Sequence, residues 1–297
     1  MEKRIIVVAL ILGVLSADLF SLSGGRVSET EKKFQRFIVE YEKDYDTVEE
    51  YFQRLEIFEA NLKRFEEHNS NPSSTYTMGI NRFADMLPEE FNQHKIKLPV
   101  DMERTGRALV EDEGQVNHFN ILKEKFGVES DVTIDWTKLG VVGSVGNAGQ
   151  YQQGTSFMIT QTINSAKAIR DQTKLQTKYS YQELRDCTED LQSAIEFTVS
   201  KGIERFDEYS NSGSGCNYDP TKYSLNVKEW DLIQEGQSEV MKTRLTGQPL
   251  LTLVSANSGA FMYYTGGVIT SGCFESSELD HSVLLVGYDN EKKTWKA

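Results

Sequence analysis

The amino-acid sequence predicts an α+β protein, because helical and strand patterns occupy different parts of the chain. Residues 28–70 carry apolar side chains at helical spacing and contain no Pro or Gly. A second helical pattern follows a polar, Gly-containing loop at residues 147–157 and runs to Arg170. From Gln248 onward, short apolar stretches broken by Gly are typical of strands. Helices and strands are therefore expected in separate regions of the fold.

Composition limits the class of protein. The chain has 297 residues, of which 38% are hydrophobic, so it can bury a substantial core in one or two domains. The net charge of −13 argues against nucleic acid or an anionic membrane as a partner. We expect a monomer without a metal ion or cofactor.

The first residues predict a secretory signal peptide at residues 1–17. The apolar run Ile5–Leu15, interrupted only by Gly13, follows a charged start and precedes the small residues Ser16 and Ala17. A membrane anchor is the alternative, but spanning needs about 20 apolar residues and this run is shorter. The signal peptide places the protein in the secretory pathway, with an extracellular or a lysosomal or vacuolar destination.

Two amphipathic helices are predicted after the signal peptide. The first begins at a capping Ser28, and the second runs from about Thr47 to His68. The residues expected to face inward are Phe34, Phe37, Ile38 and Tyr41 in the first helix and Phe52, Leu55, Phe58, Leu62 and Phe65 in the second. Such a pair occurs in many helical proteins, so the pattern alone assigns no function.

Two motifs in this region carry a more specific signal. The first is Glu50, Arg54, Phe58, Asn61, Phe65 and Asn69, and the second is Gly79, Asn81, Phe83 and Asp85. Together they resemble the propeptide motifs of cathepsin L-like zymogens in the papain family, with Phe65 in place of the usual Ile. The resemblance implies an inhibitory propeptide at residues 18–128 and a papain-like peptidase domain at residues 129–297. A small helix is possible at residues 119–126, and cleavage is expected near residues 130–133.

The loop that starts at Asn147 resembles the family's catalytic segment, Asn-Gln-Gly-x-Cys-Gly-Ser-Cys-Trp-Ala-Phe-Ser. In an ungapped comparison, Gly154 stands at the nucleophilic Cys and Ala148 at the Gln of the oxyanion hole. Tyr151 stands at a disulfide Cys, and Thr155 replaces the Trp. Thr155 or Ser156 is expected to cap the following helix, whose inner face is predicted to contain Ile159, Ile163, Ala166 and Ile169.

The resemblance also assigns the three cysteines. Tyr179–Cys187 is similar to the family's Leu-Ser-Glu-Gln-Glu-Leu-Val-Asp-Cys, and Cys187 and Cys216 correspond to a disulfide pair of the family. If Cys187 and Cys216 form this disulfide, Cys273 is the odd thiol. The alternative is that Cys187 and Cys216 are two free thiols. The family's Cys-Asn-Gly-Gly wall of the substrate cleft is absent after Cys187, where the sequence passes directly into a helical pattern.

Strands are predicted at residues 249–256, 261–269 and 282–288, and His281 precedes the last of them. Leu279-Asp280-His281 matches the context of the family's catalytic His. The family continues into Lys-Asn-Ser-Trp-Gly, which this sequence does not reach, so a C-terminal truncation is expected. The resemblance implies a papain-like two-lobed fold, with a helical lobe and an incomplete β-barrel-like lobe, preceded by the helical propeptide.

Cysteine peptidase chemistry needs a thiolate, and Gly154 cannot supply one. We therefore expect a catalytically inactive, cathepsin L-like homologue, a pseudoenzyme whose propeptide binds or inhibits related cysteine proteases. The expected partner is an active cathepsin-like protease, or a peptide in the cleft. Two alternatives are an active endopeptidase with an unrecognised nucleophile and an unstable truncated product.

Overall fold

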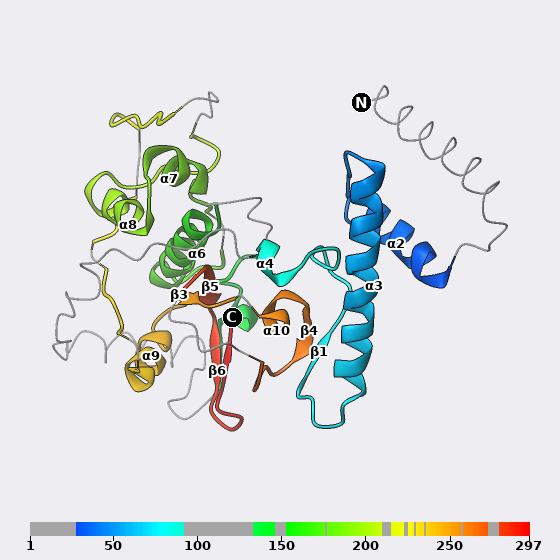
Figure 1. Cartoon of the computed structure of the whole chain (residues 1–297). Coiled ribbons are helices and arrows are strands. Elements are labelled where there is room, and N and C mark those ends of the chain that lie inside the picture. The colour runs from blue at the N-terminus through cyan, green and yellow to red at the C-terminus, as the bar shows by residue number, and fades with distance from the viewer. Residues whose placement is uncertain are drawn as a thin grey trace. The chain divides into compact units, whose positions relative to one another are not determined.

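The structure, a computed structural model, describes residues 28–91, 133–145, 153–175, 177–209, 215–222, 225–228, 230–234, 236–256, 258–272 and 279–297. The predicted signal peptide, the possible helix at residues 119–126, Ala148, Tyr151 and Cys273 lie outside these residues. The chain forms two compact units (Figure 1). The N-terminal unit contains the residues up to Leu87 together with Tyr263–Gly267, and the C-terminal unit contains Pro88–Met262 and Val268–Ala297.

Two helices and a two-stranded sheet form the described part of the N-terminal unit. Helix α2 spans Glu29–Glu40 and helix α3 spans Val48–Ser70, and the side chains of Ser28 and Thr47 cap them by accepting hydrogen bonds from backbone N–H groups of the first turn. Strand β1, Tyr76–Met78, pairs antiparallel with β4, Tyr264–Gly267. The predicted start of the first helix is confirmed.

Aromatic rings fill the interior between α2 and α3. Phe34, Phe37 and Phe58 are buried, and the ring of Phe58 lies 5.2 Å from that of Phe34 and 5.0 Å from that of Phe37. The prediction that Phe52 faces inward is wrong, because its side chain is 46% exposed. Six residues separate it from Phe58, which at 3.6 residues per turn is roughly 240° around the helix. Tyr51, seven residues from Phe58, packs on Phe34 instead.

The sheet of the N-terminal unit depends on Gly267. This residue has φ of +96°, and a Cβ there would lie 2.5 Å from the carbonyl oxygen of Thr75. An L side chain is disfavoured at such a φ, and a contact of that length with backbone oxygen cannot be relieved by a rotamer change. Only Gly fits where β4 meets the residue before β1.

The C-terminal unit begins with a short helix and is dominated by α6. Helix α6, Gln153–Arg170, packs against α7, Tyr181–Cys187, α8, Leu191–Ser200, and strands β3 and β5 (Figure 1). Ile159, Ile163 and Ile169 are buried as predicted, whereas Ala168 rather than Ala166 completes the face. The other helices among the described residues of this unit are α4, Pro88–Phe91, a 3₁₀ helix at Trp136–Leu139, α9, Ser238–Leu245, and α10, Gly259–Met262.

The described residues of the C-terminal unit also contain two small antiparallel sheets. Strand β3, Leu250–Val254, pairs with β5, His281–Leu285, and the register places Val254 opposite His281. Strands β2, Ile134–Asp135, β6, Gly287–Asp289, and β7, Thr294–Lys296, form the other sheet in the order β2-β6-β7. The strand predicted to begin at Phe261 is wrong over its first residues, since Phe261 and Met262 lie in α10.

Two hydrophobic clusters stabilise the C-terminal unit. One surrounds Trp136, whose side chain is fully buried and whose indole N–H donates to the carbonyl of Leu245 over 2.8 Å. The other joins α6, α7 and α8 through Ile159, Leu184 and Leu191. Helical and strand-rich parts are thus segregated, which confirms the predicted α+β class. Among the described helices, none has the length and apolar character needed to cross a membrane.

Candidate active site

Helix α6 begins one residue before the predicted nucleophile position. Its first residue is Gln153, so Gly154 lies in the first turn. The prediction that Thr155 or Ser156 caps this helix is therefore wrong, because both residues lie inside it. Backbone N–H groups in a first turn have no intrahelical acceptor, and they carry the partial positive charge of the helix N-terminus. This geometry stabilises a thiolate or an oxyanion where a suitable side chain is present.

Gly154 supplies no side chain to that position, although space for one exists. A Cβ built at Gly154 would lie 3.8 Å from the Oγ of Ser282, which is an ordinary van der Waals contact. The backbone would therefore accept a Cys without a steric conflict at its Cβ. Because Ser282 directly follows His281 in β5, the start of α6 and the start of β5 lie close together.

Aromatic residues flank the ring of His281. The ring centroid of Phe261, from α10, lies 5.5 Å from that of His281, and the centroid of Phe91, from α4, lies 6.4 Å away. Burial lowers the pKa of His281, and the nearby Asp280 carboxylate opposes this shift. Among the described residues, none forms a hydrogen bond with the His281 ring. The lowered pKa favours a neutral imidazole at neutral pH. No carboxylate or amide side chain among the described residues orients the ring by a hydrogen bond.

The hydroxyl groups near Gly154 are wholly or partly buried. Ser156 is 6% exposed and Ser282 is 3% exposed, so both lie inside the protein. Thr155 is half-buried one residue after Gly154. A hydroxyl is also far less acidic than a thiol, so a buried Ser without a strong adjacent base is a poor nucleophile. Ala148, the predicted oxyanion position, lies outside the described residues.

The propeptide motif residues are gathered around Asp85 in the N-terminal unit. The Asp85 carboxylate is almost completely buried and accepts hydrogen bonds from Lys43 Nζ at 2.8 Å and from the Tyr45 hydroxyl at 2.9 Å. Arg54 donates to the Asp85 carbonyl over 3.1 Å and lies 3.9 Å from Glu50. Burial, followed by the charge of Asp85, raises the pKa of Tyr45, so this hydroxyl stays protonated and remains a donor.

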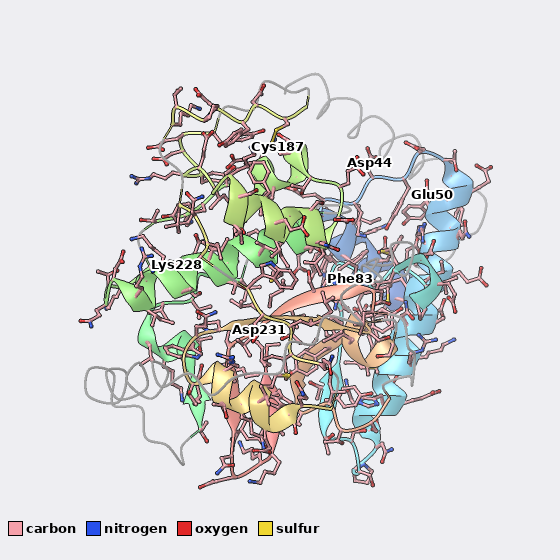
Figure 2. The ribbon with its side chains drawn as sticks, turned by 90° about the vertical axis from the view of Figure 1, so that its left-hand side faces the viewer. Asp44, Glu50, Phe83, Cys187, Lys228 and Asp231 are labelled. Carbon is pink, nitrogen blue, oxygen red and sulfur yellow. A yellow bond between two sulfur atoms is a disulfide. The ribbon has the colours of Figure 1, made fainter. Side chains whose placement is uncertain are left out.

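Two Asn side chains attach the second motif to α3. Asn61 Nδ2 donates to the carbonyls of Ala84 and Met86, and Asn69 exchanges two hydrogen bonds with the backbone of Met78. Asn81 accepts from the N–H of Phe83. The N–H of Gly79 donates to Tyr263, and a Cβ at Gly79 would lie only 3.0 Å from Thr265. The motif residues thus fix the turn at residues 79–86 to α3 (Glu50 and Phe83 are labelled in Figure 2).

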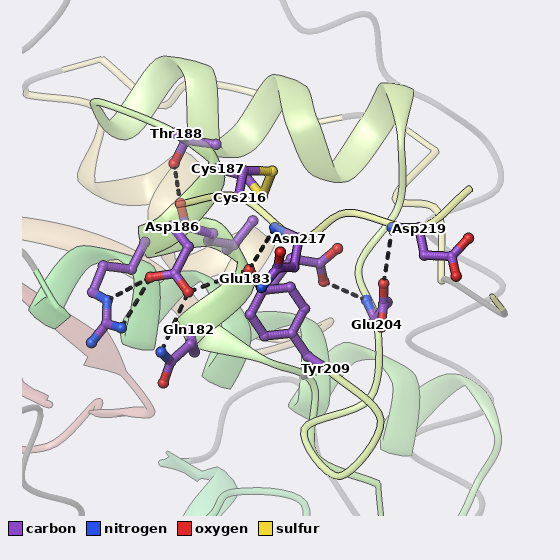
Figure 3. The surroundings of a disulfide bond; sticks show 12 residues. Gln182, Glu183, Asp186, Cys187, Thr188, Glu204, Tyr209, Cys216, Asn217 and Asp219 are labelled. Atoms are coloured by element: carbon purple, nitrogen blue, oxygen red, sulfur yellow. Dashed lines mark hydrogen bonds and ion pairs between the residues drawn. A yellow bond between two sulfur atoms is a disulfide. The ribbon is translucent and has the colours of Figure 1, made fainter. Parts of the chain in front are cut away.

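A disulfide joins Cys187, the last residue of α7, to Cys216 (Figure 3), which confirms the predicted pair. The bond closes a loop with a sequence separation of 29 residues. A cross-link of this length stabilises a fold by about 3–4 kcal/mol, mainly by restricting the unfolded chain. The tertiary structure after α7 therefore depends on a covalent link as well as on packing.

Sequence reasoning missed two residues of the site. Ser282 is the side chain nearest to the Gly154 position, and its place directly after His281 in an apolar strand could have drawn attention to it. Phe91 lies 190 residues before His281 in the chain, and no spacing rule links the two. Only the tertiary structure brings α4 and β5 together.

Comparison with known families gives two matches. Residues 34–91 match the cathepsin propeptide inhibitor domain, and residues 131–296 match the papain family cysteine protease domain. The first match covers α2, α3 and the motif residues around Asp85. The second covers α6, the disulfide and His281.

Relatives of similar sequence extend over almost the whole chain. The chain is 31% identical to the probable cysteine protease RD21C of Arabidopsis thaliana, over 96% of this chain and 65% of that protein. It is 30% identical to the probable cysteine protease RDL2 of the same plant, over 96% of this chain and 81% of that protein. Fruit bromelain of Ananas comosus is 27% identical, over 89% of this chain and 74% of that protein. The chain thus spans only 65% of the first of these relatives.

Solved structures agree with the fold. A recombinant stem bromelain precursor aligns with a TM-score of 0.70 and 26% identity, covering 88% of this chain and 83% of that one. Procathepsin L2 from the larval midgut of Tenebrio molitor aligns with a TM-score of 0.72 and 25% identity, covering 90% and 87%. These likenesses confirm a papain-like α+β fold preceded by a helical propeptide. The chain belongs to the papain family of cysteine proteases and carries a cathepsin-type propeptide inhibitor domain.

Proposed function

We propose that this papain-family homologue lacks peptidase activity and acts by binding, because Gly154 stands at the position of the nucleophile. The observation that carries the proposal is the first turn of α6. It keeps the helix N-terminus and room for a Cβ, yet presents no side chain. Peptide hydrolysis by this family's chemistry requires a thiolate attacking the carbonyl carbon, with an imidazole as its ion-pair partner and proton donor. His281 alone cannot perform the first of these steps.

The binding role is assigned to the N-terminal unit. The propeptide motif around Asp85 has a complete set of partners, and this favours a folded inhibitor domain over a vestigial segment. We propose that the partner is an active cathepsin-like cysteine protease. The two proteins would bind each other in the secretory pathway or in a lysosomal, vacuolar or extracellular space. In that role the chain inhibits such an enzyme or assists its folding.

The first test measures peptide cleavage at acidic pH after propeptide removal. Wild type and His281→Ala are compared side by side, and we expect no turnover above background in either. Turnover that disappears in His281→Ala would mean that a nucleophile other than residue 154 is present. The variants Thr155→Val and Ser282→Ala would then identify it, since Thr155 directly follows Gly154 and Ser282 Oγ lies 3.8 Å from the Cβ position of residue 154.

The second test measures inhibition of an active cathepsin L-like enzyme. The full chain and a fragment of residues 18–128 are titrated against the enzyme at fixed substrate concentration. We expect concentration-dependent inhibition by at least one of them. Asp85→Asn should weaken it, whereas Asp44→Asn, an exposed neighbour of the same charge, should not. Absence of inhibition by both proteins up to high micromolar concentration would refute the inhibitory role.

A further inference from the structure

Two Glu side chains are completely buried beside the disulfide. Glu183 lies in α7 and Glu204 lies in the following segment, residues 203–209, and both are 0% exposed (Figure 3). Buried carboxyl groups are rare unless they are paired with a cation, because removal from water disfavours the charged form. Neither residue belongs to the candidate active site or to the propeptide motif. Their burial therefore calls for a separate explanation.

Hydrogen bonds connect the two carboxyl groups to the disulfide-linked segment. One oxygen of Glu183 accepts from the backbone N–H of Glu204 at 2.7 Å. Glu204 accepts from the N–H of Asp219 at 3.5 Å and from Lys222 Nζ at 3.2 Å. Lys222 also donates to the carbonyl of Glu208 over 2.9 Å. Residues 203–209 and 215–222, which we call the latch segment, are thus held to α7 through Glu183 and Glu204.

The charges in this cluster do not balance when both carboxyl groups are ionised. Lys222 forms an ion pair with Glu204, and among the described residues no cation forms one with Glu183. The second oxygen of Glu183, Oε1, is buried and has no hydrogen-bond partner among the described residues. An ionised Glu183 would therefore place an incompletely solvated anion next to a second anion. A buried group in that state costs far more free energy than a neutral one.

The other ionisable groups around Glu183 do not supply the missing cation. On α7 itself, Arg185 pairs with Asp186. Tyr209 of the latch segment donates to Asp186 over 3.3 Å, and the Asp219 carboxylate is engaged by Thr221. Helices α6 and α8, which pack against α7, contribute apolar residues such as Ile163 and Leu191 to the surrounding cluster. The geometry consequently favours a protonated Glu183.

We propose that Glu183 is the proton-binding group of a pH-sensitive latch, which holds residues 203–209 and 215–222 against α7 when Glu183 is protonated and loosens them when it is ionised. The Cys187–Cys216 disulfide keeps the latch segment attached to α7 in both states. Deprotonation then produces a local opening rather than a loss of the whole C-terminal unit.

The direction and range of the pH effect follow from the pKa of Glu183. Burial raises this pKa from 4.5 to about 7; the Glu204 N–H and Lys222 oppose the shift, and the charge of Glu204 adds to it. A raised carboxyl pKa stabilises the closed form fully below the ordinary pKa. That stabilisation is lost as pH rises through the raised pKa. The closed form should lose about two orders of magnitude in its equilibrium constant between pH 5 and pH 8.

Hydrogen exchange of the full chain tests this inference. Exchange is followed by mass spectrometry at pH 5 and pH 8, with times scaled for the intrinsic pH dependence of amide exchange. We expect protection of the latch segment to fall at least tenfold between the two pH values, while α3 keeps its protection. In Glu183→Gln the latch segment should be protected equally at both pH values. Glu189→Gln, an exposed Glu two residues after α7, should behave as wild type.

Two further variants test the charge balance. Glu204→Gln removes the neighbouring anion, so the midpoint of opening should move to lower pH. Lys222→Met removes the cation, so ionised Glu204 should disfavour ionisation of Glu183 further and move the midpoint to higher pH. Equal protection of the wild-type latch segment at pH 5 and pH 8 would overturn the proposal, as would unchanged pH dependence in Glu183→Gln. If Glu183→Gln does not fold, opposite midpoint shifts in the other two variants support the latch, and absence of those shifts refutes it.

Discussion

The propeptide motif and the candidate active site differ in how their side chains are bonded. In the N-terminal unit, the Asp85 carboxylate is buried and bonded to two donors, and Asn61 and Asn69 bind the backbone on either side of the motif turn. In the C-terminal unit, His281 is enclosed by Phe91 and Phe261, while the position opposite Ser282 has no side chain at all. The first region is held together by side chains with hydrogen-bond partners, and at Gly154 the second presents only backbone.

This difference reflects the kind of group on which each region depends. A helix N-terminus is produced by backbone hydrogen bonding, so α6 forms whether residue 154 is Gly or Cys. The propeptide motif instead depends on side chains, because each one satisfies a buried backbone or charged group. A change at Asp85 or Asn61 therefore affects folding, whereas a change at residue 154 affects reactivity.

The largest expected change comes from restoring a thiol at the helix start. In a Cys273→Ser background, Gly154→Cys should be alkylated by iodoacetamide with an apparent pKa below 8.5, because the α6 N-terminus stabilises the thiolate. Alkylation rates are measured from pH 5 to pH 9. Ser200→Cys, at the last residue of α8, is the control, because a helix C-terminus favours the neutral thiol. Equal pKa values for the two thiols would mean that the frame around residue 154 has been lost as well.

Removing the disulfide is the next largest change. The double variant Cys187→Ser/Cys216→Ser should lose about 3–4 kcal/mol of unfolding free energy, since the cross-link closes a loop of about 30 residues. Urea unfolding measures this loss. Cys273→Ser should unfold like wild type, because the sequence predicts that this residue is the unpaired thiol. A large loss from Cys273→Ser would contradict that assignment.

Neutralising Asp85 should have a smaller effect on stability. Asp85→Asn keeps the size of the side chain but weakens the bonds from Lys43 and Tyr45, so we expect a loss of about 2 kcal/mol. Asp44→Asn is the matched control, as Asp44 is exposed and only one residue from Lys43 and Tyr45. Equal stability of the two variants would mean that the motif is held by packing alone.

The smallest expected effect concerns the retained His. The pKa of His281, measured by NMR, should lie below 6.5, because burial between aromatic rings disfavours the imidazolium. Phe91→Ala should raise it towards 6.5 by admitting water to the ring. Phe52→Ala removes an exposed aromatic ring of the N-terminal unit and should leave the value unchanged. A His281 pKa above 6.5 would show that the Asp280 carboxylate outweighs burial.

Local signals in the sequence predicted part of this structure. The Ser28 cap, the aromatic faces of the first two helices and the pairing of Cys187 with Cys216 were accessible from residue types and from the family resemblance. The start of α6 was misplaced because Thr155 and Ser156 are good capping residues by type, yet the helix begins before them. Propensity near a helix end is easily outweighed by tertiary packing.

Other features of the structure were missed for different reasons. Phe52 was misassigned because an aromatic residue in an amphipathic helix was taken to face inward, although the helical spacing turns it outward. The buried pair Glu183 and Glu204 gave no signal either, since polar residues in a short helix usually face water. Enclosure of His281 by Phe91 likewise appears only when the chain is folded.

The pairing of β1 with β4 has a consequence for the order in which this protein folds. Tyr76 lies opposite Gly267, so the N-terminal unit contains hydrogen bonds between residues 191 positions apart. A ribosome delivers the chain from its N-terminus, and the helices α2 and α3 emerge long before Tyr264–Gly267. Contacts between residues so far apart in sequence form slowly, because the entropy of closing a long loop is lost before the contacts stabilise the fold. During synthesis β1 therefore stays unpaired until β4, which is translated much later, has been made.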